Sequence, residues 1–179
     1  EFNLAYKTVL VHVRRFSEQK NPTFLLDVFS KYHKTNPDSV LMLVGKGELE
    51  NEIKEKIKTL GIGDSVIFTG IREDVGALLS AFDVFVFPSL YEGLSVVLIE
   101  AQFNGLPIIT NSNISKESII SDNAFLLPID SIDPWVGCIE KHSGNRTNNI
   151  DYNKFDVSRT SKQILDIYDR IVNKGKTNE

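Results

Sequence analysis

The hydrophobic residues of the first two thirds of the chain follow two alternating patterns. Short, almost continuous apolar runs predict strands that are buried on both faces, whereas segments with an apolar residue every three or four positions predict amphipathic helices. We expect strands over residues 8–13, 40–44, 66–68, 83–87, 106–110 and 124–127. Six such runs, separated mostly by helices, predict an α/β fold: a Rossmann-like parallel sheet of about six strands with helices on both faces.

Start and stop signals delimit the expected helices. Asn21 is a typical N-cap before a proline at the first helical position, and the helix that follows ends at Asn36. Gly61 is a typical stop for a charged helix over residues 48–60. Further helices are expected over residues 74–82, from about 95, and over 116–121, 133–142 and 157–172. The last of these carries a broad apolar stripe: Ile164, Leu165, Ile167, Tyr168 and Ile171.

The composition fits one globular domain. The 179 residues are 41% hydrophobic and 25% charged, as is typical of a folded domain of this length. We expect a single domain over residues 1–179, with 151–179 as its terminal helix segment. The formal net charge is −4, whereas nucleic-acid-binding proteins usually carry a basic excess, so no nucleic-acid partner is expected.

Three further features concern the environment of the chain. The single cysteine, Cys138, cannot form an internal disulfide, which favours a reducing, cytoplasmic compartment. No stretch approaches the ~20 apolar residues that span a bilayer, so no transmembrane segment is expected. The chain begins at Glu1 without Met, and we expect a fragment of a longer polypeptide. Peripheral association of that polypeptide with the inner face of a membrane stays open.

Candidate chemistry lies beyond the carboxyl ends of the strands, because parallel α/β sheets bind their ligands there. The segment 88–95 (PSLYEGLS) follows a strand and leads into a helix. It places Glu92 in the loop, eight positions before Glu100 in the helix. Each glutamate alone is equally well explained as a solvated charge. Together they frame a site in which Glu100 can accept hydrogen bonds from the vicinal hydroxyls of a ribose.

The loop between the two glutamates is suited to an anion. Gly93 lets the backbone approach a ligand closely. The amides of Leu94 and Ser95 stand at the expected helix N-terminus, where exposed N–H groups and the helix dipole favour negative charge. A phosphorylated small molecule is therefore a better candidate ligand than a polymer of nucleotides.

A second group of candidates is cationic. Arg15 and Lys20 flank the loop after the first expected strand. A guanidinium binds phosphate bidentately and an ammonium acts as a compact point charge, so the pair suits a diphosphate. Two ordinary surface cations beside Glu18 are the competing interpretation.

Three other residue groups are expected to be structural. His12 lies within the first expected strand and is interpreted as a core histidine rather than a base. Trp135 is expected to anchor the C-terminal helices. The segment GKG (45–47) lacks the third glycine of a dinucleotide-binding fingerprint and the ending of a P-loop, so it is interpreted as a turn.

Taken in chain order, the candidate residues resemble one family. Arg15 and Lys20, the segments GKGE (45–48), FTG (68–70) and PS (88–89), and the E-x7-E spacing of the two glutamates are similar to the C-terminal, donor-binding half of the retaining family 4 glycosyltransferases, which have the two-domain GT-B architecture. The resemblance covers about residues 8–130 and extends to the terminal helix. The segment HVRRFSEQKN (12–21) further resembles members that build bacterial capsular polysaccharides or exopolysaccharides.

The resemblance implies roles for the candidates in binding a nucleoside-diphosphate sugar. Arg15 and Lys20 would hold the diphosphate and stabilise the leaving group, and Glu92 would contact the donor sugar near the reacting carbon. The other implied donor contacts are Glu100 at the ribose, the amides of Gly93, Leu94 and Ser95, and Ile71 and Arg72 at the base. No cofactor or metal is implied, because cations and the helix terminus would replace it. The N-terminal, acceptor-binding domain would be missing, so we expect weak nucleotide binding and no sugar transfer by this chain alone.

One residue departs from the family pattern. Family members usually have glycine immediately before the arginine, where this chain has Arg14. Glycine keeps the loop slim so that phosphate can approach, whereas an arginine either tilts away and adds charge or crowds the site. Two alternatives therefore stay open: a nucleotide-binding module without chemistry of its own, and a GT-B epimerase that acts on the same class of donor.

Overall fold

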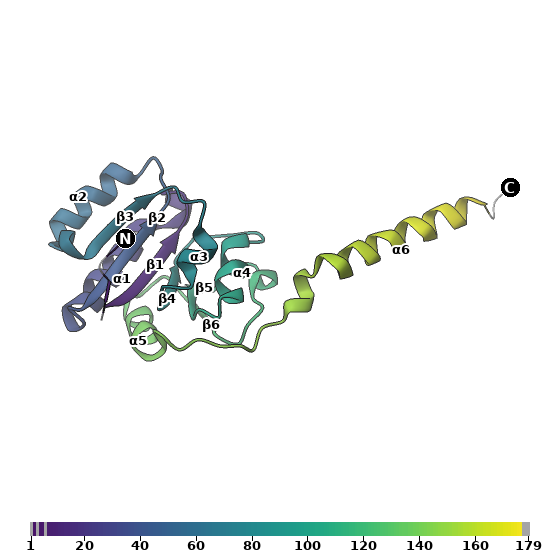
Figure 1. Cartoon of the computed structure of the whole chain (residues 1–179). Helices are drawn as coiled ribbons and strands as arrows, with labels where there is room; N and C mark the ends of the chain where they lie inside the picture. The colour runs from purple at the N-terminus through teal and green to yellow at the C-terminus, as the bar shows by residue number, and fades with distance from the viewer. Residues whose placement is uncertain (1, 3, 6, 177–179) are drawn as a thin grey trace.

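A six-stranded sheet forms the centre of the computed structural model, which describes residues 2, 4, 5 and 7–176 (Figure 1). The strands are β1 (Thr8–Val13), β2 (Ser39–Val44), β3 (Val66–Gly70), β4 (Val84–Phe87), β5 (Ile108–Asn111) and β6 (Ala124–Leu127). Their order across the sheet is β3-β2-β1-β4-β5-β6, and every neighbouring pair is parallel. The predicted Rossmann-like class is confirmed, with strands close to the expected bounds.

Helices cover both faces of this sheet. The covering helices are α1 (Pro22–Thr35), α2 (Glu50–Leu60), α3 (Val75–Leu79), α4 (Val96–Phe103) and α5 (Asp133–His142). A further helix, α6 (Val157–Lys176), lies away from the sheet. Four short 3-10 turns lie in the connections of the described chain: η1 (Glu18–Lys20), η2 (Gly63–Ser65), η3 (Lys116–Ser118) and η4 (Tyr152–Phe155). The helix expected over residues 116–121 is wrong in type and length, because only the three-residue turn η3 forms there.

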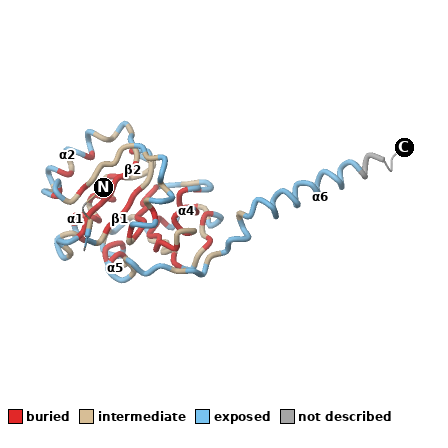
Figure 2. The backbone as a smooth tube through the Cα atoms, in the orientation of Figure 1, coloured by how far each residue is buried: buried red, intermediate tan, exposed pale blue. Residues whose placement is uncertain are grey.

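The core has two layers, one on each face of the sheet, because successive strand residues point to opposite faces. Leu10 and Leu41 pack with residues of α1, α2 and α5 on one face. Val11 and Met42 pack with residues of α3 and α4 on the other. Trp135 is fully buried in the first layer, and its Nε1–H donates to the Pro128 carbonyl at 2.8 Å. Figure 2 shows this burial concentrated on the strands and on the inner sides of the helices.

The two expected helix boundaries at Asn21 and Gly61 have different outcomes. Gly61 closes α2 in the left-handed conformation with φ of +68°, as the sequence predicts. Asn21 occupies the N-cap position of α1, but its side chain makes no capping hydrogen bond and its φ is +51°. Asn21 therefore suits this position because asparagine tolerates the left-handed region, not because it caps the helix.

The terminal helix α6 stands apart from the rest of the chain. It projects from the body of the domain as a single rod (Figure 1), and its residues 157–172 are exposed (Figure 2). Its expected apolar stripe lies in solvent, with Leu165 62% and Ile171 63% exposed. The expected segment 151–179 thus comprises η4 and α6, with 177–179 outside the described residues. Among the described helices, none combines the length and apolarity needed to cross a bilayer.

Candidate functional site

The candidate site lies where the strand order reverses. β1 pairs with β2 on one side and with β4 on the other, so the loops that follow β1 and β4 leave the sheet as neighbours and run to opposite sides. A crevice at the carboxyl ends of the strands is the usual result at such a position. The loop after β1 carries Arg14, Arg15 and Lys20, and the loop after β4 carries Glu92. These residues form what we call the β1/β4 crevice.

Backbone hydrogen bonds tie the loops at this edge of the sheet to one another. The Gly45 N–H donates to the Gly70 carbonyl at 2.8 Å and the Phe16 N–H to the Lys46 carbonyl at 3.1 Å. Across the crevice, the Leu90 N–H donates to the Gln19 carbonyl at 2.8 Å. The loops after β3, β2, β1 and β4 therefore form one connected rim.

Two glycines allow the loops after β1 and β2 to lie in direct backbone contact. A Cβ atom on Gly45, whose φ is +135°, would lie 2.1 Å from the Arg14 carbonyl oxygen. A Cβ atom on Gly47 would lie 2.2 Å from the Phe16 carbonyl oxygen. The GKG segment is thus a turn, as the sequence predicts, and also the contact surface that fixes the position of the arginine-bearing loop.

Glu92 is the centre of the crevice. Its side chain is only 8% exposed, and its Oε1 lies 2.5 Å from the Lys20 Nζ, which is 12% exposed. Its Oε2 lies 3.7 Å from the Arg14 Nη2. Burying a carboxylate is costly unless cations and hydrogen bonds compensate it. Each oxygen of Glu92 has its own cation, so the structure brings two of the three expected catalytic residues, Lys20 and Glu92, into direct contact.

Arg14, the residue that departs from the pattern of the resembled family, turns toward Glu92 and the start of α4. Its Nη2 donates to the Ser95 Oγ at 2.7 Å, and its guanidinium lies 5.5 Å from the centre of the Phe87 ring. The side chain is 27% exposed. Arg14 therefore neither tilts away nor remains a loose surface charge: it joins the end of β1 to the start of α4.

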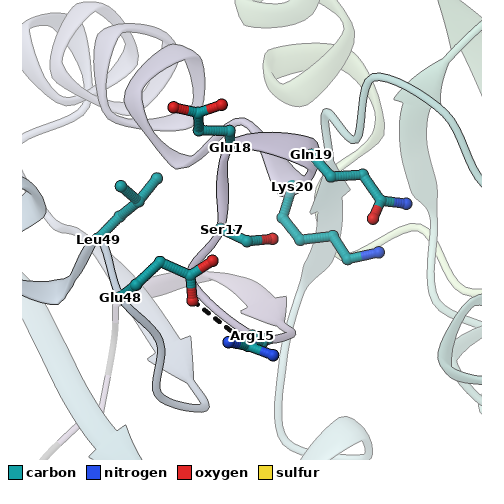
Figure 3. Close-up of a pocket in the computed structure, with 7 residues that line it drawn as sticks. All are labelled: Arg15, Ser17, Glu18, Gln19, Lys20, Glu48 and Leu49. Atoms are coloured by element: carbon teal, nitrogen blue, oxygen red, sulfur yellow. Dashed lines mark hydrogen bonds and ion pairs between the residues drawn. The ribbon is translucent and has the colours of Figure 1, made fainter.

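Arg15 has the opposite orientation. Its side chain is 73% exposed, and its Nε donates to the Glu48 Oε2 at 3.0 Å. The hydrogen bond from Arg15 adds to one from the backbone of Glu48 itself in lowering the pKa of this carboxyl. Arg15 and Lys20 line an open pocket of about 510 Å³ with Ser17, Glu18, Gln19, Glu48 and Leu49 (Figure 3). Figure 3 shows Arg15 turned toward Glu48, whereas the Lys20 ammonium extends away from it.

The start of α4 is only partly as expected. Gly93 and Leu94 are exposed beside the crevice, and Glu100 is exposed farther along the helix. Ser95, however, is fully buried and its N–H donates to the Ser118 Oγ at 2.9 Å. The Ser95 amide is thus engaged inside the protein rather than offered to a ligand, because η3 packs a hydroxyl against the helix start.

Ile71 and Arg72 lie farther along the same edge. They follow β3, which is separated from β1 by β2. Ile71 is 75% exposed, and Arg72 forms a bidentate pair with Asp74 at 2.8 and 2.7 Å. Hydrogen bonds from Arg72 lower the pKa of the Asp74 carboxyl. The structure therefore places these two residues on the connected rim, two strands from the Arg14–Glu92 pair.

His12 lies in β1 beneath the charged residues and is fully buried, which confirms its interpretation as a core histidine. Its Nδ1 lies 3.0 Å from the Val86 carbonyl oxygen, which can only accept, so Nδ1 carries the proton. Burial lowers the pKa of His12 to about 4, and the nearby cations Arg14 and Lys20 act in the same direction. The imidazole is therefore neutral at physiological pH and adds no further positive charge.

Two polar residues to which the sequence assigned no role also shape the crevice. Asn111, at the carboxyl end of β5, is buried and donates from Nδ2 to the carbonyls of Ser89 and Leu90 at 2.9 and 3.1 Å. Ser118 in η3 receives the Ser95 amide. A polar residue directly after a buried apolar run, as Asn111 is, is the signal that could have identified the first. Across the residues that the structure describes, no group of three or more His, Cys, Asp and Glu side chains could hold a metal ion.

The chain is similar to known bacterial proteins over most of its length. It is 33% identical to the UDP-Gal:alpha-D-GlcNAc-diphosphoundecaprenol alpha-1,3-galactosyltransferase of Escherichia coli, over 93% of this chain and 46% of that protein. It is 42% identical to the putative glycosyltransferase EpsF of Bacillus subtilis, over 63% of this chain and 29% of that protein. Among solved structures, HepE of Anabaena in complex with UDP-glucose matches with a TM-score of 0.81 at 23% identity, over 93% of this chain and 50% of that one.

These comparisons show how much of each relative the chain covers and to which family it belongs. The chain spans about half the length of the Escherichia coli relative and half of HepE. The family model described as glycosyl transferases group 1 matches residues 3–154, which include all six strands and the whole β1/β4 crevice. The chain therefore belongs to the group 1 glycosyl transferases.

Proposed function

We propose that this chain is the donor-binding half of a retaining glycosyltransferase that takes a sugar from a nucleoside diphosphate. The observation that carries the proposal is the contact between Lys20 and Glu92, two side chains almost withdrawn from water at the reversal point of the sheet. A buried ion pair of this kind is weak evidence for stability. A donor-binding site, however, needs a cation for the anionic diphosphate and a carboxylate to accept hydrogen bonds from the sugar hydroxyls.

The cations would bind the diphosphate and support its departure. Arg15 is exposed in the open pocket and can form bidentate hydrogen bonds to phosphate, and Lys20 lines the same pocket. As the bond between the sugar and the diphosphate breaks, negative charge develops on the leaving oxygen. Cations held at the leaving oxygen by the bound donor would stabilise that charge more than they stabilise the donor itself, and this difference would lower the barrier.

The acidic residues would bind hydroxyl groups. Glu92, relieved of Lys20 by the phosphate, would accept hydrogen bonds from the donor sugar near the reacting carbon, and Glu100 would accept from the ribose. The exposed amides of Gly93 and Leu94 would contact the phosphate side of the donor, and the backbone at Ile71 and Arg72 would line the base pocket. In this proposal the cations and the start of α4 serve in place of a metal ion.

UDP-sugars are the first donors to test. One relative is named for UDP-Gal and the structural neighbour HepE holds UDP-glucose. A further relative, 40% identical over 58% of this chain, is the Vi polysaccharide biosynthesis protein VipC/TviE of Salmonella typhi. We therefore propose a UDP-sugar donor and a role in the synthesis of a bacterial surface polysaccharide.

The exposed face of α6 fits the proposal that a second domain completes the enzyme. α6 carries apolar side chains that no part of the described chain covers, among them Ile164, Leu165 and Tyr168. The chain spans about half the length of its relatives, so an acceptor-binding domain is the occupant we propose for this face. Sugar transfer would require both halves, because the acceptor and the donor would meet between them.

Calorimetric titration with UDP, GDP and ADP tests the donor site. We expect weak binding of at least UDP, and a loss of affinity of about tenfold in Arg15→Ala, because one charge-assisted contact to phosphate is removed. Lys58→Ala removes an equal charge from the exposed far end of α2, where Lys58 pairs with Glu55, and should leave the affinity unchanged. A chain that binds none of the three nucleotides, or equal losses in both variants, would contradict the proposal.

A non-catalytic nucleotide-binding module is the second candidate, favoured by Arg14 in the place of the family's glycine. Both candidates expect UDP to bind to this chain. They differ in a protein that also contains the acceptor-binding domain, where only the enzyme transfers sugar and loses this transfer on Arg15→Ala. Nucleotide binding without any transfer from UDP-glucose or UDP-galactose in that longer protein would favour the module.

A further inference from the structure

Glu92 has two cations, but the proposed donor competes for only one of them. Lys20 lines the open pocket in which the diphosphate would sit, and Arg14 does not. Lysine is a point charge on a flexible stem, so Lys20 can move from a carboxylate to a phosphate at little cost. Once it does, Glu92 would remain almost buried with no cation on Oε1, a state that is strongly unfavourable for an ionised carboxylate.

Arg14 is held where it can compensate that state. Its backbone N–H donates to the Val44 carbonyl at 3.0 Å, and its guanidinium is fixed between the Ser95 hydroxyl and the Phe87 ring. Its Nε is buried and has no hydrogen-bond partner among the described residues, so the guanidinium keeps an unused donor inside the crevice. These contacts restrict Arg14 to the Glu92 side of the crevice.

Resting on the proposed function, we propose that Arg14 is a positioning residue that pairs with the Glu92 carboxylate and keeps it oriented while Lys20 binds the donor diphosphate. Arg14 would thus promote diphosphate binding without touching the phosphate. It lowers the cost of separating Lys20 from Glu92 and leaves the carboxylate ready to accept from the sugar hydroxyls. The adjacent Arg15, exposed and turned to the pocket, would contact phosphate directly.

The neighbouring arginines make a matched pair for a double-mutant test. UDP affinity is measured calorimetrically for the 179-residue chain, for Arg14→Met and Arg15→Met, and for each in an E92Q background. Arg14→Met should weaken UDP binding about tenfold while Glu92 is ionised, and by at most about threefold in E92Q, because the buried charge that Arg14 compensates has been removed. Arg15→Met should weaken binding by about the same factor in both backgrounds.

Two further variants separate positioning from folding. Arg14→Lys keeps a charge near Glu92 and should restore part of the affinity, and Ser95→Ala, which removes the anchor of the guanidinium, should weaken UDP binding only while Glu92 is present. Thermal unfolding identifies any variant that fails to fold.

The outcomes distinguish this inference from the function on which it rests. Loss of affinity on Arg14→Met that persists in E92Q would make Arg14 a phosphate ligand or a structural residue and overturn the inference. Undiminished UDP binding by Arg14→Met would overturn it as well, with the donor site intact. Failure of the unmodified chain to bind UDP would reject the proposed function, and the inference with it.

Discussion

The β1/β4 crevice and the terminal helix α6 are unusual in opposite ways: the first buries charged side chains, and the second exposes apolar ones. In the crevice, Glu92 and Lys20 are charged but almost withdrawn from water; on α6, apolar residues such as Leu165 and Tyr168 are more than half exposed. The crevice charges are compensated by other residues of the same chain. The apolar side chains of α6 have no cover within the described chain. The difference is that the charged pair is compensated within the chain, whereas the apolar face of α6 would need a partner to be covered.

Close backbone packing is what should make the crevice rigid, and a methyl group at Gly47 tests this most severely. Its Cβ would lie 2.2 Å from the Phe16 carbonyl oxygen and 2.4 Å from the Phe16 nitrogen, both backbone atoms that cannot rotate away. We expect Gly47→Ala to lower the free energy of unfolding by about 4 kcal/mol, above the roughly 1–3 kcal/mol usual for overpacking, because both clashes are with backbone atoms. Urea denaturation measures the change.

Gly137→Ala is the matched control for this substitution. Gly137 lies inside α5 with nothing within 4 Å of the added Cβ. We expect this variant to gain about 0.5–1 kcal/mol, because alanine favours a helix over glycine. A loss below about 1 kcal/mol for Gly47→Ala would show that the two loops separate easily, and would contradict a rigid crevice.

His12 makes the crevice sensitive to acid, with an expected effect of about 3 kcal/mol. Its pKa is lowered by burial from 6.5 to about 4. The unfolded chain therefore takes up a proton that the folded chain refuses, so the stability from neutral His12 is complete above pH 6.5 and is lost as the pH falls through about 4. We expect urea denaturation to show this loss between about pH 7.5 and 4.

His12→Asn supplies the comparison, because the asparagine amide can still donate to the Val86 carbonyl that His12 contacts. The variant should lose less stability than the unmodified chain over the same pH range. If the free energy of unfolding of the two proteins changed in parallel with pH, burial would not lower the pKa of His12. The exclusion of water from the base of the crevice would then be contradicted as well.

The order of apolar runs and stop residues made the fold predictable, and the strand ends made the general position of the site predictable. Nothing local determines where Arg14 points, because its partner Ser95 comes from an element 81 residues away. The commitment of the Ser95 amide to Ser118 depends equally on packing between distant segments. For α6, the periodicity predicts an apolar face but contains no information on what covers it. The catalytic and donor-binding roles expected from the sequence all remain predictions, those of Arg15, Lys20 and Glu92 included.

Removing one cation from Glu92 should have a smaller effect on stability than either change above. Lys20→Met leaves Arg14 beside the carboxylate, so we expect a loss of about 2 kcal/mol, below the range for a fully unpaired buried charge. Lys58→Met breaks an exposed pair with Glu55, both 71% exposed, and should cost no more than about 0.5 kcal/mol. Denaturation of both variants at neutral pH provides the comparison. Equal losses of stability would mean that water screens the charges in the crevice as well as it screens charges on the surface.

The smallest effect is expected on α6, where it is also the most informative. Replacing Ile164 and Leu165 by glutamine should change the stability of this chain by less than about 0.5 kcal/mol, because these residues are already 48% and 62% exposed and lose little packing. In a protein that also contains the proposed acceptor-binding domain, the same replacement should cost about 2 kcal/mol, since the side chains would then be buried. A large loss in this chain alone would place α6 against its own domain in solution. The exposed helix would then cease to be a docking surface, and the contrast with the self-compensated crevice would disappear.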